Sequence, residues 1–213
     1  NRLLFSIFFW RKIKRYQVLW LGHPALFDYF KWLPTKHLDI VYDCMDDVVE
    51  FPQVKSNPQY PGFLFKAEHE LLKNAKTVFF SSATLRHRLI KRNAIEGLDT
   101  KSLVVNNALP AGFENKFLTI NETKSKPDTL IRIGYFGTIA DWLDWNLIKE
   151  SLKRFPNIVY IFYGPVDSKN RLIHERIIYA GVVEHEKIPG CLHDLSVLVM
   201  PFIRNQLVEA VDP

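Results

Sequence analysis

The feature that most constrains this chain is the alternation of short apolar runs with longer segments of helical periodicity. Runs rich in β-branched and aromatic residues predict β-strands, because such side chains suit a pleated, half-buried surface. Four of these runs lie in the first half of the chain, at residues 17–22, 39–43, 77–82 and 102–107. Strands that alternate with helices are typical of βα units around a parallel sheet, so the pattern predicts an α/β fold.

The segments between the runs predict amphipathic helices. In residues 65–75, four residues recur at intervals of three or four, so we expect one buried helix face made of Phe65, His69, Leu72 and Ala75. Residues 83–93 show the same periodicity.

A polar stretch, NETKSKPD at residues 121–128, contains a proline and no apolar residue and predicts a linker. The pattern then restarts, with a helix over 144–155 and strands at 130–136, 158–164, 177–182 and 196–202.

We therefore expect a first domain over 1–122, a linker over 123–128 and a second domain over 129–213. The chain opens at Asn1 without a methionine and stops at Pro213 soon after a predicted strand. Both domains are accordingly expected to be incomplete.

Composition narrows the class of protein. Hydrophobic residues make up 47% and charged residues 24%, which suits a packed globular chain and argues against a disordered one. A net charge of +5 suits an anionic partner without choosing among phosphate esters, acidic lipid and nucleic acid. Cys44 and Cys191 lie far apart with no CxxC motif, so the sequence predicts reduced thiols in the cytoplasm rather than a disulfide framework or a zinc site.

The N-terminal segment combines an apolar run, LLFSIFFW, with the basic residues RKIKR at 11–15. The run is short of the roughly 20 residues that a membrane-spanning helix needs. Cations beside aromatic residues suggest peripheral contact with an anionic membrane, and a solvated helix face is the alternative. A second basic segment, RHRLIKR at 86–92, lacks interleaved aromatic residues, so no nucleic-acid partner is predicted.

Candidate phosphate-binding groups follow the strands of the second half, because ligands bind beyond the carboxyl ends of parallel strands. A glycine at Gly137, followed by Thr138, lets backbone N–H groups approach a diphosphate. The full GxGxxG motif is absent, and a turn glycine with Asp141 as helix N-cap is the alternative. Gly164 and Gly181 end the next two runs, where turn chemistry is again the alternative.

Two polar residues, Arg204 and Asn205, lie just past the last predicted strand. A guanidinium group binds phosphate in a bidentate manner, so Arg204 is a candidate phosphate ligand, with a solvated loop arginine as the alternative.

The acidic trio Asp43, Asp46 and Asp47 follows a strand of the first half. Crowding of like charges is expected to raise the pKa of at least one of these carboxyls, which then orients a sugar hydroxyl or acts as a base. Neither a histidine nor a further carboxylate stands at a convincing spacing for a metal site, and Asp43 or Asp46 as helix N-cap is the alternative. His23, after the first strand, is a further candidate, with a structural histidine as the alternative.

Taken in order, several motifs resemble bacterial GT-B glycosyltransferases of the family-four type, especially those that act on teichuronic acid and on capsular or exopolysaccharides. In the second half the resemblance lies in IRIGYFGTIADWLDWNLIKESLKRFPNIVYIFYGPV and GVVEHEKIPGCLHDLSVLVMPFIRNQLVEAVDP. In the first half it lies in YDCMDD, AEHELLKNA, TVFFSSATLRHRL and VVNNALPAGF. It covers residues 17–213 and rests on the order of the motifs.

This resemblance implies two Rossmann-like domains with parallel sheets, both incomplete in this chain. A nucleotide-sugar donor would be held mainly by the second domain and the acceptor by the first, with no metal cofactor. Gly137 and Thr138 would face the diphosphate, Arg204 and Asn205 would match the polar segment before the donor helix, and His185 would line the nucleobase pocket.

In the first domain, the resemblance places the acidic trio near the reacting sugar and His23 on the acceptor side. One motif departs from the family: Asn107 stands where relatives carry a glycine, and the aspartate that ends that motif is absent.

The implied activity is transfer of a sugar from a nucleotide-diphosphate donor to a lipid-linked or growing glycan, with retention, in the cytoplasm at the inner face of the membrane. Arg204 and the N–H groups after Gly137 would stabilise the leaving diphosphate. Two alternatives stay open: a GT-B epimerase or phosphorylase, and a non-catalytic module that binds a nucleotide or a glycan.

Overall fold

The computed structural model describes residues 2–33, 36–108, 111, 130–167 and 171–204. These residues form two units, one up to Asn107 and one from Ala108 to Arg204, each with a sheet and a core of its own. The predicted linker at 123–128 lies outside the described residues.

The first unit is built on a four-stranded parallel sheet in the order β1-β2-β3-β4. Its strands are β1 (Val18–Leu21), β2 (Asp39–Cys44), β3 (Thr77–Phe80) and β4 (Ser102–Val104). Its helices are α1 (Arg2–Ile13), α2 (Pro24–Phe30), α3 (Pro52–Lys55), α4 (Tyr60–Asn74) and α5 (Ala83–Asn93), with a 3₁₀ turn at Val48–Glu50. All four strands predicted for this half are present.

The strand order explains which face of this sheet is covered. Every crossover steps in the same direction, and right-handed crossovers then place the connecting helices on one face. The core on that face joins strand residues such as Tyr42 and Phe80 to helix residues such as Leu71 and Leu89. On the other face Trp20 is 57% exposed.

The face of α4 that packs on the core agrees with the predicted one only in part. Leu72 is buried as predicted, and so is Ala75 just after the helix. Phe65 is exposed, whereas Leu64 and Leu71 are buried in its place. The buried stripe passes through Glu68, whose ion pair with another helix lets a charged residue occupy a core position.

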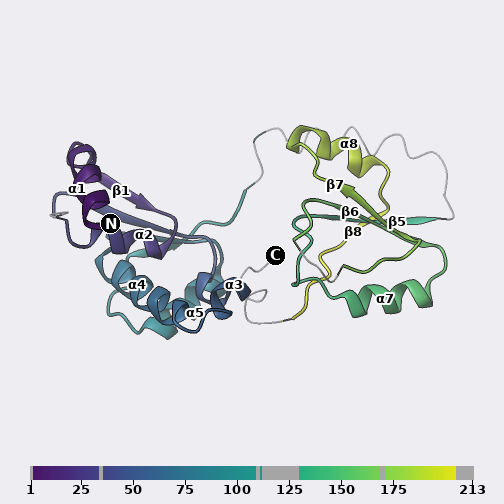
Figure 1. The fold of residues 1–213 in the computed structure, drawn as a ribbon, viewed down its shortest axis with the longest axis horizontal. Coiled ribbons are helices and arrows are strands. Elements are labelled where there is room, and N and C mark those ends of the chain that lie inside the picture. The colour runs from purple at the N-terminus through teal and green to yellow at the C-terminus, as the bar shows by residue number, and fades with distance from the viewer. Residues whose placement is uncertain (1, 34–35, 109–110, 112–129, 168–170, 205–213) are drawn as a thin grey trace. The chain divides into compact units, whose positions relative to one another are not determined.

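The second unit is also a four-stranded parallel sheet, in the order β7-β6-β5-β8. Its strands are β5 (Ile131–Phe136), β6 (Ile158–Tyr163), β7 (Ile177–Gly181) and β8 (Val197–Leu198). Its helices are α7 (Trp145–Arg154) and α8 (Ile188–His193), with a 3₁₀ turn at His185–Lys187. Figure 1 shows α7 and α8 on opposite faces of the sheet, as expected where the strand order reverses.

The start of α7 corrects one expectation. Asp144, not Asp141, is the N-cap, and its side chain accepts a hydrogen bond from the Leu147 N–H at 2.9 Å. The chain between the two aspartates stays outside the helix because Leu143 forms a β-bridge with Phe202.

Both units thus confirm the predicted α/β class with parallel sheets. Within the described ranges, every helix is too short or too polar to cross a bilayer.

Candidate functional site

The strand order of the second sheet marks one place for a ligand. β5 lies between β6 and β8, so the chain first builds outward on one side of β5 and then returns to its other side. In an open α/β sheet, ligands bind beyond the carboxyl ends of the strands at such a reversal. The turn after β5 and the segment after β8 therefore form the candidate donor site.

Two predicted glycines, Gly137 and Gly164, allow close approach of the turns after β5 and β6. Their φ angles are 152° and 142°, a region that favours glycine. A Cβ atom on Gly164 would overlap the carbonyl oxygen of Gly137. The Gly137 N–H donates to the Tyr163 carbonyl at 2.9 Å, and the Gly164 N–H donates to the Gly181 carbonyl at 2.8 Å. Both amides are thus used within the fold.

The turn after β5 is held from inside the unit. The Tyr135 hydroxyl donates to the Thr138 carbonyl at 2.9 Å, and the Ile139 N–H donates to the Pro165 carbonyl at 2.8 Å. Burial raises the pKa of Tyr135, so this hydroxyl stays protonated as a donor. In the part of the chain that the structure describes, no group accepts a hydrogen bond from the Thr138 N–H. Thr138 therefore offers the backbone donor that the sequence assigned to this turn.

The segment after β8 lies against the loop that precedes α7. The Asp144 N–H donates to the Pro201 carbonyl at 2.7 Å, and the Ile203 N–H donates to the Trp142 carbonyl at 2.8 Å. These bonds bring exposed Arg204 to the same edge of the sheet as the turn after β5. Its guanidinium forms no ion pair with any of the residues described.

The remaining predicted donor-side residues are His185 and Asn205. His185 is exposed and begins the 3₁₀ turn after β7, beyond the carboxyl end of that strand. Asn205 lies outside the described residues.

In the first unit, the acidic trio is divided between two environments. Asp47 is buried, and its two oxygens accept hydrogen bonds from Nη1 of Arg92 at 2.9 and 3.0 Å. Nη2 of Arg92 donates to Glu68 at 2.7 Å, and Asn93 donates to the same Glu68 oxygen at 3.2 Å. Asp47 is therefore a buried counterion of the half-buried Arg92.

Asp43 and Asp46 remain at the carboxyl edge of the first sheet. Asp43 accepts a hydrogen bond from the Trp20 indole N–H at 3.2 Å. Burial raises the pKa of Asp46, so the cause is desolvation rather than the like-charge repulsion that the sequence suggested. Neither residue caps a helix, because the N-cap of the following 3₁₀ turn is Asp47.

Two residues that the sequence did not single out organise this edge. The Ser81 hydroxyl donates to the Met45 carbonyl at 2.5 Å, and the Asn106 side chain donates to the Ser81 carbonyl at 3.0 Å. These bonds join the turns after β2, β3 and β4. The signal available in the sequence is that each of the two is a polar residue at the second-last position of a predicted strand.

His23 caps a helix. Its Nδ1 accepts a hydrogen bond from the Ala25 N–H at 3.2 Å, at the start of α2. Burial lowers the pKa of His23, which favours the neutral ring that this cap requires. Its geometry is that of the structural histidine.

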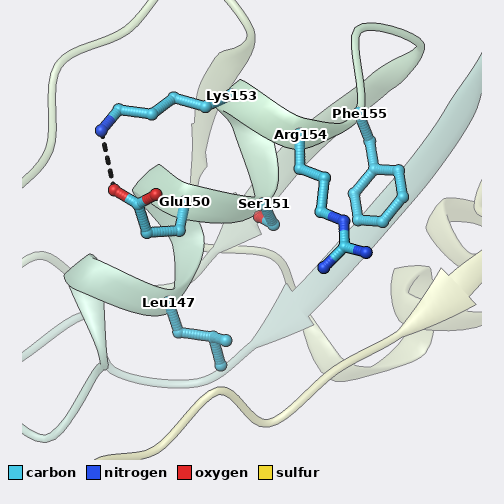
Figure 2. A pocket seen from close by; sticks show the side chains of 6 residues that line it. All are labelled: Leu147, Glu150, Ser151, Lys153, Arg154 and Phe155. Carbon is cyan, nitrogen blue, oxygen red and sulfur yellow. Dashed lines mark hydrogen bonds and ion pairs between the residues drawn. The ribbon is translucent and has the colours of Figure 1, made fainter.

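A hollow on the second unit lies apart from these groups. Figure 2 shows it along α7 and at the residue after it, lined by Leu147, Glu150, Ser151, Lys153, Arg154 and Phe155. A crossover helix runs antiparallel to its strands, so the end of α7 lies near the amino ends of the strands, away from the reversal beside β5. Across the described ranges, His, Cys, Asp and Glu side chains do not gather in threes as a metal site requires.

No protein-family model matches the chain. The chain is 24% identical over 208 residues to TuaH of Bacillus subtilis (strain 168), named as a glycosyltransferase of teichuronic acid biosynthesis. The match covers 90% of this chain and 49% of TuaH, so the chain spans about half the length of that relative.

Solved structures share the fold at lower identity. HepE of Anabaena, solved with UDP and glucose, matches with a TM-score of 0.64 and 13% identity, over 91% of this chain and 54% of HepE. The catalytic domain of starch synthase IV from Arabidopsis thaliana, bound to ADP and acarbose, matches with a TM-score of 0.58 and 9% identity, over 93% of this chain and 55% of that one. TarM matches with a TM-score of 0.57 and 12% identity, over 85% of this chain and 35% of TarM. These matches confirm the GT-B fold and the resemblance to glycosyltransferases.

Proposed function

Since the chain has the fold of GT-B glycosyltransferases, we propose that it belongs to an enzyme that transfers a sugar from a nucleotide-diphosphate donor to a glycan. The observation that carries the proposal is the reversal of strand order beside β5, which brings Thr138 and Arg204 to one sheet edge. HepE and starch synthase IV, which share this fold, were solved with UDP and ADP. A nucleoside diphosphate is the leaving group of the proposed reaction.

On the donor side, the leaving diphosphate gains negative charge as the glycosidic bond breaks. The guanidinium of Arg204 and the N–H of Thr138 are the groups that we assign to stabilise this charge. The Gly137 N–H is excluded from that role, because it already donates to Tyr163. His185 and Asn205 are assigned to the nucleobase side and to the polar segment after Arg204.

On the acceptor side, Asp46 is the carboxyl that we assign to orient the reacting hydroxyl. Its partial burial raises its pKa, which suits a group that shares a proton with a hydroxyl. Asp43, fixed by Trp20, flanks it. We further propose transfer of a hexose with retention to a lipid-linked or growing surface glycan.

We also propose that the reaction needs no metal ion and that the protein acts in the cytoplasm. Because Arg204 supplies positive charge for the diphosphate, the reaction is proposed to need no metal, and chelation is expected to leave the rate unchanged. Both cysteines are free thiols, which suits the reducing cytoplasm, where we place the protein.

The test is nucleotide release from a panel of UDP-, GDP-, ADP- and dTDP-sugars by the protein in its full natural length. Arg204→Ala is expected to lower kcat/KM about 100-fold, the usual effect of removing one donor that stabilises a developing anion. The matched control is Arg154→Ala, which removes an exposed arginine from the hollow along α7 and is expected to leave kcat/KM unchanged.

Three results would contradict parts of this proposal. Equal rates for Arg204→Ala and the unmodified protein would remove the role of Arg204. A product that contains no second sugar would indicate an epimerase, and a phosphorylated sugar a phosphorylase. Nucleotide binding without release from any donor would indicate a binding module.

A further inference from the structure

The positive charge of the chain is concentrated at one end. Residues 1–38 contain seven of the 28 lysines and arginines, and Asp28 is their only acidic residue. The rest of the chain therefore holds 21 basic residues against 22 acidic ones. Asp28 is itself paired with Lys31 at 2.5 Å. The whole basic excess thus belongs to α1, α2 and the residues around them.

One face of α1 attaches this helix to the first unit. Ile13 is part of the core, the Phe9 ring contacts Phe30 at 6.4 Å between centroids, and the Trp10 ring contacts His37 at 5.6 Å. The last turns of α1 therefore lie beside the segment that links α2 to β2.

The opposite face of α1 points away from the core. Phe8 is 62% exposed, and Arg11 and Lys12 follow it at helical spacing, also exposed. The neighbouring segment after α2 adds Trp32, which is 79% exposed. We define the basic aromatic surface as Phe8, Arg11, Lys12, Lys31, Trp32 and Lys36.

A lysine ammonium lies over each exposed aromatic ring of this surface. The Lys12 ammonium lies 5.3 Å from the centroid of the Phe8 ring, and the Lys31 ammonium lies 5.2 Å from that of Trp32. Aromatic rings with adjacent lysines are favoured at the headgroup level of a bilayer, where the ring contacts acyl chains and the ammonium reaches the phosphates.

We propose that the basic aromatic surface binds the headgroup region of an anionic lipid bilayer. Contact would be peripheral, since no described helix is long and apolar enough to span a membrane. Nucleic acid fits less well, because a base stacks on an open ring face and here a lysine lies over each ring. This inference does not depend on which sugar is transferred, or on whether any is.

The test is co-sedimentation with vesicles of phosphatidylcholine and phosphatidylglycerol, beside vesicles of phosphatidylcholine alone. Each basic residue near an anionic surface contributes about 1 kcal/mol, or about fivefold in the partition coefficient. The triple variant with Arg11, Lys12 and Lys36 changed to Gln is therefore expected to bind about 100-fold more weakly at low salt. The matched control changes Lys66, Lys73 and Lys91 to Gln, which removes the same charge from exposed helix positions of the same unit.

A separate variant tests the contribution of the exposed Trp32 ring to binding. Trp32→Ala is expected to weaken binding about tenfold at low and high salt alike, because the contact it removes is apolar. Circular dichroism of each variant checks that the fold is kept. The proposal is overturned by absence of binding at low salt, by equal losses in the two triple variants, or by tighter binding to a single-stranded oligonucleotide than to the anionic vesicles.

Discussion

The buried carboxylate of Asp47 is paired with the half-buried guanidinium of Arg92, with both carboxylate oxygens within 3.0 Å of Nη1. Arg92 also binds Glu68 at 2.7 Å, so one arginine neutralises two carboxylates whose side chains are fully buried. The pair joins the turn after β2 to α5, and Glu68 adds α4. The turn that carries Asp46 is thus fixed by a network one residue away.

Removing Arg92 from this network is expected to destabilise the first unit strongly. Arg92→Met leaves the buried carboxylates of Asp47 and Glu68 without their nearest cation, and such a loss destabilises a protein by about 3–5 kcal/mol. Arg88 then remains at 3.8 Å from Asp47. Asp47→Leu leaves Arg92 paired with Glu68 and is expected to cost less. Urea unfolding followed by circular dichroism measures the change. The double variant with Asp47→Leu and Arg92→Met is expected to lose less than the sum of the single losses. Losses of a surface pair, below about 1 kcal/mol, would show that the network is not buried in solution.

The stability of the first unit is expected to depend on pH through Glu68. Burial raises the pKa of Glu68, although Arg92 opposes the shift, and the Glu68 Oε1 atom has no partner among the described residues. The folded state therefore binds more protons than the unfolded state above the ordinary glutamate pKa of about 4.3, so the free energy of unfolding falls as pH rises from there. Burial also raises the pKa of Asp46, so this carboxyl likewise lowers the free energy of unfolding as the pH rises. Urea midpoints measured from acid to neutral pH should decline less steeply in Glu68→Gln, and an identical slope would contradict the role of Glu68.

Gly164→Ala is expected to disturb the candidate donor site. The added methyl group would overlap the Gly137 carbonyl, and the φ of 142° strains any other residue, which together destabilise by about 2 kcal/mol or more. The affinity for the donor should fall as well, because the added methyl group forces the turns after β5 and β6 apart. The matched control is Gly62→Ala in α4, where a Cβ atom meets nothing within 4 Å and helix propensity gives a gain of up to about 1 kcal/mol. Thermal unfolding and nucleotide titration measure both effects.

Local sequence pattern predicted the strands of both sheets, because each strand is a short run of apolar residues that needs no distant partner to be recognised. The local pattern did not predict features that depend on contacts between distant segments of the chain. The buried face of α4 includes Glu68, which Arg92 and Asn93 on α5 stabilise there by an ion pair and a hydrogen bond. The helix predicted over 144–155 is confirmed with Asp144 as its N-cap. The alternative of an Asp141 cap is not confirmed, since Leu143 forms a β-bridge with Phe202.

The candidate site shows the same limit. Thr138 and Arg204 are distant in sequence, and each is predictable as a residue that follows a strand. They lie at the same edge of the sheet because β8 pairs with β5. The residues of β5 and β8 do not by themselves determine this strand order. The separation of Asp47 from Asp43 and Asp46 likewise depends on an arginine in another helix.

The two cysteines are expected to differ in reactivity. Cys44 is buried, and burial raises its pKa well above the usual range, so its thiolate is scarce at neutral pH. Cys191 is half-buried in α8 and can be reached. Ellman's reagent should therefore modify one thiol in the native protein and two in urea. The Cys191→Ser variant should lose the native reaction, and rapid modification of this variant would show that Cys44 is accessible.

The Tyr135 hydroxyl holds the turn after β5 through the Thr138 carbonyl. Tyr135→Phe removes the hydrogen bond to the Thr138 carbonyl, a loss of about 1 kcal/mol, and frees the turn whose N–H we assign to the donor diphosphate. The KM for the donor sugar is therefore expected to rise about fivefold, because the binding geometry must be restored at each encounter. Tyr160→Phe is the matched control: its hydroxyl is 2.9 Å from the Ser151 hydroxyl on α7, so a comparable loss of stability should leave the KM unchanged. A rise in KM in both variants would attribute the effect to general loosening of the unit, whereas a rise in Tyr135→Phe alone would support the assigned role of Thr138.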